Sequence, residues 1–257
     1  MPAAPTPPAA GAHAVDVAPA GSRRGPGPRG SLLLAFAGWF VGTAASALVL
    51  VGMAAAGVVE RGDSTSELPL WAVTVVQLPL WAGMVGATWL ASHRGGTGRL
   101  SDDVGLKARW IDLPLGLLAG VGTYVVAVTL LAVAYELVGV DPDRVGGPAR
   151  SLAERADGIG LVFYLVITLV GAPIAEELFY RGLVLGGLLR RMGPTLALVV
   201  SSVVFGAMHL QLLELPALIA FGAAAAFLTL RTGRLGTAIC AHAGFNATAV
   251  TISLVAG

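Results

Sequence analysis

Seven long windows without a charged residue recur along this chain, and they constrain its fold more than any other feature. A membrane-spanning helix needs about 20 consecutive apolar residues, and most of the windows reach that length. Their bounds are 31–59, 68–92, 113–135, 158–175, 192–213, 215–230 and 235–257. We therefore predict an all-α fold, a polytopic transmembrane bundle of about seven spans in which the sixth is the shortest.

The overall composition excludes several classes of protein. Hydrophobic residues make up 56% of the 257 residues, charged residues only 12%, and the mean hydropathy is +0.80. These values exclude a soluble enzyme with a charged shell, and the net charge of +1 excludes a nucleic-acid binder. The single cysteine, Cys240, excludes an intramolecular disulfide. We expect a multi-pass protein of a bacterial inner (plasma) membrane, with the lipid bilayer as its main partner.

The first 30 residues differ from the rest. They hold seven of the fifteen prolines together with many alanines and glycines. Such a segment cannot bury enough apolar surface to offset the entropy lost on ordering. We predict that residues 1–30 form a disordered cytoplasmic tail and that residues 31–257 form one transmembrane bundle.

Basic residues indicate the orientation of the bundle, because they are enriched on the cytoplasmic side of membrane proteins. If the N-terminus is cytoplasmic, the inner segments carry twelve of the sixteen basic residues. The outer segments carry Arg61, Arg144, Arg150 and Arg155, mixed with acidic residues. We therefore predict a cytoplasmic N-terminus and an external C-terminus.

Ionisable side chains inside membrane helices are costly and call for an explanation. The first group is Glu176 and Glu177, which follow eighteen uncharged residues and precede Arg181. Glu177 and Arg181 lie one helical turn apart and can pair, whereas Glu176 points about 100° away. An interfacial acid–base cluster at a helix end is the structural alternative to a catalytic pair.

Two further groups lie on later helices. Phe205 and His209 are spaced by four residues, as are His242 and Asn246, so each pair shares a helix face. Gly244 lies on the opposite side of its helix, where it permits close packing. Hydrogen bonding between helices is the structural alternative for these polar residues.

The three groups are expected at similar depths. If residues 192–194 form a turn, Glu177 and His209 lie sixteen residues on either side of Gly193, about 24 Å along their helices. His242 lies within about 12 Å of that level. We predict that Glu177, His209 and His242 line one aqueous chamber, which water enters from the cytoplasm.

The motifs Glu-Glu-x-x-x-Arg, Phe-x-x-x-His and His-x-x-x-Asn, in that order on successive membrane helices, resemble the CPBP intramembrane protease family. This family is also called Abi or type II CAAX prenyl endopeptidase. The resemblance covers residues 158–257 and implies an intramembrane endopeptidase acting on a membrane-associated or prenyl/CAAX-like protein or peptide. The residues that carry it are Glu176, Glu177, Arg181, Phe205, His209, His242 and Asn246.

The chemistry expected of such a site is addition of water to an amide carbonyl. A glutamate assisted by His209 would deprotonate the water, with Glu176 as the freer base, while His242 and Asn246 would stabilise the oxyanion. Zn²⁺ bound by Glu177, His209 and His242 is an open alternative, although the sequence has no His-Glu-x-x-His signature. A transporter subunit or a non-catalytic immunity or scaffold protein are the alternative functions.

Overall fold

The computed structural model describes residues 28–60, 68–141, 144–156 and 158–256, and the regular elements in these ranges are all helical. Six helices are long and apolar enough to cross a membrane, and Pro194–Met208 is a shorter apolar helix. Together they correspond one to one to the predicted windows. The all-α fold with about seven spans is therefore confirmed, and the protein is a multi-pass membrane protein. The predicted tail lies, apart from residues 28–30, outside the described residues.

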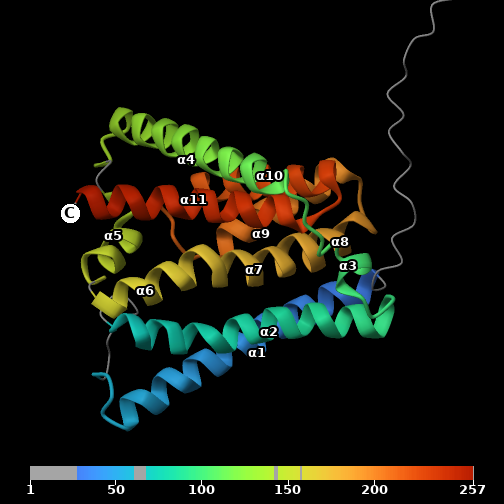
Figure 1. Ribbon diagram of the computed structural model, residues 1–257, viewed down its shortest axis with the longest axis horizontal. Helices are drawn as coiled ribbons and strands as arrows, with labels where there is room; N and C mark the ends of the chain where they lie inside the picture. The colour runs from blue at the N-terminus through green and yellow to red at the C-terminus, as the bar shows by residue number, and fades with distance from the viewer. Residues whose placement is uncertain (1–27, 61–67, 142–143, 157, 257) are drawn as a thin grey trace, which may run out of the picture.

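The helices lie side by side along the long axis of the molecule (Figure 1), with α4 and α1 at opposite edges. In chain order they are α1 Pro28–Ala55, α2 Leu70–Gly95, α3 Leu100–Asp103, α4 Asp112–Leu137, α5 Gly147–Glu154, α6 Gly158–Val166, the π-helical η2 Ile167–Gly171, α7 Ala172–Glu177, the π-helical η3 Leu178–Val184, α8 Leu185–Leu189, α9 Pro194–Met208, α10 Leu215–Thr232 and α11 Leu235–Ala256. We call the end where α1 begins the N-terminal end of the bundle. The opposite end, where α11 stops, is the C-terminal end.

Glycines allow a close contact between the helices α4 and α11. A Cβ atom on Gly116 would lie 2.6 Å from the Thr237 carbonyl oxygen, and one on Gly244 would lie 2.7 Å from the Leu117 carbonyl oxygen. Neither position can carry a side chain without separating the helices. The expected packing role of Gly244 is thus confirmed, and it fits membrane helices, which associate through small residues.

The hairpin of α9 and α10 is shorter than its neighbours. Gly193 caps α9 and Pro194 opens it, as the predicted turn at residues 192–194 requires. However, α9 has 15 residues and α10 has 18, so the prediction that the sixth span is the shortest is wrong. The fifth window is longer than its helix because the residues after Met208 form the turn to α10 instead of continuing α9 toward the C-terminal end of the bundle.

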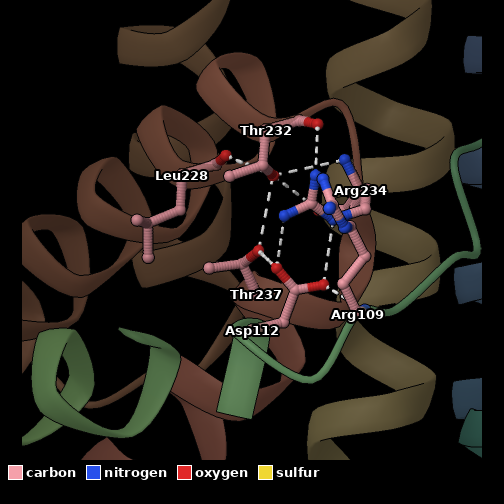
Figure 2. A network of polar contacts seen from close by, with 6 residues as sticks. All are labelled: Arg109, Asp112, Leu228, Thr232, Arg234 and Thr237. Atoms are coloured by element: carbon pink, nitrogen blue, oxygen red, sulfur yellow. Dashed lines mark hydrogen bonds and ion pairs between the residues drawn. The ribbon is translucent and has the colours of Figure 1, made fainter. Parts of the chain in front are cut away.

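A polar network closes the N-terminal end of the bundle (Figure 2). The Asp112 carboxylate accepts hydrogen bonds from Arg234 Nε at 2.9 Å and Nη2 at 2.5 Å, and from Thr237 Oγ1 at 2.6 Å. The backbone N–H of Arg109 donates to the same carboxylate at 2.6 Å. Asp112 is buried, and these bonds attach the start of α4 to the turn between α10 and α11.

Candidate active site

The two glutamates lie at the end of α7, between two π-helical segments. The helix from Gly158 to Leu189 is continuous, but η2 precedes α7 and η3 follows it. A π-helical turn holds one extra residue and rotates the following side chains relative to a straight α-helix, and such turns are frequent at functional sites. Glu176 and Glu177 are neighbours within α7 and therefore point about 100° apart, while η2 sets the rotation of this pair relative to α6.

Glu177 is fully buried, and its carboxylate accepts hydrogen bonds from two side chains. Its Oε1 atom accepts hydrogen bonds from Arg181 Nη1 at 2.9 Å and from His242 Nδ1 at 2.8 Å. The predicted pairing of Glu177 with Arg181 on one helix face is observed. The bond to His242 connects α7 to α11 and orients the imidazole.

Arg181 is enclosed by aromatic rings and backbone. Its guanidinium carbon lies 4.3 Å from the ring centroid of Phe205 and 5.6 Å from that of Phe221. A further nitrogen, Nη2, donates to the Gly222 carbonyl oxygen at 3.3 Å. A buried charge requires such compensation, and the cation–π contacts strengthen where water is excluded.

Glu176 faces the other side and meets both histidines. Its Oε2 atom lies 3.7 Å from His209 Nε2 and 4.0 Å from His242 Nε2. Both distances exceed a direct hydrogen bond, and Oε2 is buried with no hydrogen-bond partner among the described residues. Three polar atoms from three helices therefore surround one point at a spacing that a single water molecule can bridge.

The hydrogen bonds of the two imidazoles fix which nitrogen faces that point. His209 Nδ1 lies 2.8 Å from the Phe205 carbonyl oxygen. Because a carbonyl can only accept, this nitrogen carries the proton. His242 Nδ1 donates to Glu177 in the same way. In both rings Nε2 is therefore the atom turned toward Glu176, and Nδ1 anchors the ring.

Asn246 lies one turn beyond His242 and is held by the π-helical segment η2. Its Nδ2 donates to the Thr168 carbonyl oxygen at 2.8 Å. The amide has a second N–H, and Asn246 lines the same cavity as His242. It can therefore offer a hydrogen bond to a group bound beside the imidazole.

A cavity of about 260 Å³ contains the cluster. Glu176, His209 and His242 line it, together with Phe205 and Asn246. Glu177 does not line it, because its carboxylate points back toward Arg181. The prediction that Glu177 faces the shared chamber is wrong, whereas the predicted convergence of three helices is observed.

Sequence reasoning missed three supporting residues. Phe221 packs 4.9 Å from the His242 ring, and Gly222 and Thr168 accept bonds from site residues through their backbone carbonyls. A backbone carbonyl is present in every residue, so the sequence does not show which one accepts a hydrogen bond. Phe221 cannot be distinguished by residue type from other apolar residues of a membrane helix. Only the periodicity of α10 could have placed Phe221 on an inward face.

The geometry does not fit the alternative in which Glu177, His209 and His242 bind Zn²⁺. Glu177 Oε1 is already engaged by Arg181 and by the anchoring nitrogen of His242. Across the described part of the chain, no group of three or more His, Cys, Asp or Glu side chains has an arrangement that could hold a metal ion. We therefore derive no step through a metal.

Comparison with known proteins identifies the part of the chain that holds this site. Residues 158–248 match the family model described as "Type II CAAX prenyl endopeptidase Rce1-like". These residues form an Rce1-like region. The resemblance to the CPBP family is thereby confirmed, and the Rce1-like region includes Glu176, His209 and His242.

One curated relative extends this comparison. A protein of Bacillus subtilis (strain 168), named "Putative membrane peptidase YdiL", is 33% identical over 90 residues. The alignment covers 35% of this chain and 37% of that relative. No solved structure matches the chain significantly.

Proposed function

We propose that the protein is an intramembrane endopeptidase in which Glu176 activates a water molecule with the help of His209. The observation that carries this proposal is the buried, unpartnered Oε2 of Glu176, which faces the Nε2 atoms of His209 and His242. This oxygen has no donor among the described residues and belongs to a side chain that lines the cavity, so it can accept a hydrogen bond from a bound water. Its position supports a chemical rather than a structural role.

In the proposed reaction, Glu176 accepts a proton from the bound water while the water oxygen attacks the carbonyl carbon of the substrate peptide. Asn246 donates its second N–H to the oxyanion that forms, and His242 donates from Nε2 in the doubly protonated imidazolium form, whose Nδ1 stays bonded to Glu177. When the C–N bond breaks, the proton passes from Glu176 to the leaving nitrogen, so the carboxylate is regenerated. Glu177 and Arg181 act as positioning residues, because they hold His242.

The substrate is proposed to be a membrane-associated peptide or protein segment. The Rce1-like match and the name of the B. subtilis relative support peptidase activity. The cavity supports an apolar chain, because Tyr124, Tyr164, Leu218 and Phe245 line it beside the polar cluster.

The test compares peptide termini in membranes from cells that carry the wild-type chain, Glu176→Gln or Glu136→Gln. Glu136 is exposed near the end of α4 and serves as the matched control. We expect termini that are present with wild type and Glu136→Gln but absent with Glu176→Gln. Identical termini in all three samples would refute the peptidase and favour a transporter or a non-catalytic scaffold.

Chelation tests the zinc alternative separately. If Glu176 alone activates water, cleavage continues in 1,10-phenanthroline. Loss of cleavage in the chelator, with recovery on adding Zn²⁺, would replace the proposed mechanism with a metal-dependent one while leaving the peptidase function in place.

A further inference from the structure

The cavity around Glu176 extends toward one end of the bundle only. Beyond the polar cluster, its walls come from α5, from the turn between α9 and α10, and from the last turns of α11. The residues are Val145, Ala149, Leu152, Gln211, Glu214 and Ser253. All of them lie toward the C-terminal end, where α4 and α11 stop and α5 crosses the bundle (Figure 1).

The opposite direction is closed by packed side chains. Phe179, Tyr180 and Leu183 follow the glutamates toward the N-terminal end and are each no more than 3% exposed. Arg181 is buried among them against Phe205. No residue of α8 or of the turn before α9 lines the cavity. Neither water nor a peptide can reach Glu176 from that end without displacing this plug.

The short α9 explains why the opening lies at the C-terminal end. Its 15 residues span about 22 Å, less than the roughly 30 Å of the hydrocarbon core. The helix α9 therefore ends inside the hydrocarbon core, and the turn after His209 lies there too. Irregular backbone is tolerated at this depth if it lines a water-filled space or is buried in protein. Leu210 in this turn has φ of 56°, a left-handed conformation that is unusual for leucine.

Two hydrogen bonds attach neighbouring elements to this turn, one from the residue that caps α5 and one from the end of α4. Glu214 Oε1 accepts from the Gly146 backbone N–H at 2.9 Å, and Tyr135 Oη donates to the Leu213 carbonyl oxygen at 2.8 Å. Ala149 and Leu152 on α5 turn toward the cavity. The mouth of the cavity is therefore built from α5 and the α9–α10 turn.

Basic residues are distributed unequally between the two ends. The closed N-terminal end carries nine in the described residues: Arg29, Arg94, Arg99, Lys107, Arg109, Arg190, Arg191, Arg231 and Arg234. Two more arginines, Arg23 and Arg24, precede the described residues in the sequence. Among the described residues, the segments at the open end carry Arg144, Arg150 and Arg155, with acidic residues among them. By the positive-inside rule the closed end faces the cytoplasm.

We infer that the chamber opens on the extracytoplasmic face of the membrane and receives an apolar peptide segment from that side. This reverses the expectation that water enters from the cytoplasm. A cytoplasmic N-terminus and a cytoplasmic chamber opening are incompatible in this fold, since the opening lies at the other end of the bundle. The part concerning the peptide rests on the proposed peptidase function, whereas the direction of opening does not.

Single-cysteine labelling tests the direction of opening. In a Cys240→Ala background, Gln211→Cys and Ala149→Cys place two independent thiols at the cavity mouth. Val138→Cys marks the exposed surface at the same end, and Lys107→Cys marks the opposite end. Each full-length variant is expressed in bacterial spheroplasts and treated with a membrane-impermeant maleimide, before and after the membrane is disrupted.

We expect both mouth variants and Val138→Cys to be labelled in intact spheroplasts, and Lys107→Cys to be labelled only after disruption. The reverse pattern would overturn the inference by inverting the topology. Labelling of Val138→Cys alone in intact spheroplasts would overturn it as well, because the mouth would then be shielded from the outside. Labelling requires no hydrolysis, so a correctly labelled chain without cleavage refutes only the proposed function, and a reversed but active chain refutes only the direction.

Discussion

Two of the buried carboxylate clusters in this bundle, those at Asp112 and at Glu176 and Glu177, differ in how completely their oxygens are satisfied. At the N-terminal end, Asp112 receives four hydrogen bonds, from Arg234, Thr237 and the Arg109 backbone (Figure 2). In the middle of the bundle, the Oε2 atoms of both Glu176 and Glu177 have no partner among the described residues. The first cluster can serve structure alone, whereas the second keeps acceptor oxygens without a donor among the described residues, and at Glu176 the cavity gives water access to them.

This difference separates residues that stabilise the fold from residues that are available for chemistry. A buried carboxylate whose oxygens are all hydrogen-bonded stabilises the fold. Its replacement removes these bonds, leaves their donors without a partner and lowers the free energy of unfolding. A carboxylate without partners weakens the fold, and functional sites commonly carry such a cost. Substitutions at Asp112 should therefore lower stability more than cleavage, and substitutions at Glu176 should lower cleavage more than stability.

The largest effect is expected for Glu176→Gln. Removing a general base lowers the rate of cleavage by about 10²–10⁴-fold, while the neutral amide relieves an unsatisfied charge. We expect an apparent unfolding temperature equal to or above that of the wild type, measured by intrinsic fluorescence of the detergent-purified protein. A clear drop in that temperature would mean that Glu176 is a structural residue like Asp112.

Arg181→Met should affect both properties. It leaves the Glu177 carboxylate buried without its cation, and breaking a buried pair in this way costs about 3–5 kcal/mol. Cleavage should fall too, because Glu177 orients His242. The double variant Glu177→Gln/Arg181→Met removes the stranded charge. It should recover stability but not cleavage, and recovery of neither would contradict the assigned pairing.

Asp112→Asn should lower stability without changing cleavage per folded molecule. Hydrogen bonds to a charged group contribute about 1.5–3 kcal/mol, and the amide also turns an N–H₂ group toward donors. The apparent free energy of unfolding should fall by about that amount. Loss of cleavage in the folded fraction would show that the two clusters are coupled.

The smallest effect is expected for Thr237→Val. This change removes one neutral donor to Asp112 and leaves Arg234 in place, so we expect a loss of about 1 kcal/mol. Denaturant titration in detergent measures it beside Asp112→Asn. A loss as large as that of Asp112→Asn would mean that the threonine, and not the arginine, carries the network.

Part of the site was predictable because helix geometry relates sequence spacing to direction and depth. The pairing of Glu177 with Arg181 followed from their four-residue spacing. The meeting of the glutamate helix with His209 followed from equal distances to the turn at Gly193. The anchoring of His242 by Glu177 was not predictable, since it depends on how α11 packs against α7.

The sequence by itself determined the number and position of the membrane helices, because a bilayer requires long apolar segments whose backbone bonds are satisfied internally. It also supplied the polar residues that such helices would otherwise avoid. Only the tertiary structure decided that Glu176, and not Glu177, faces the cavity, because π-helical turns and aromatic packing set the rotation of α7. Likewise, the short α9 and the plug beside Arg181 decided which end of the bundle is open, because side-chain packing in three dimensions determines where water can enter.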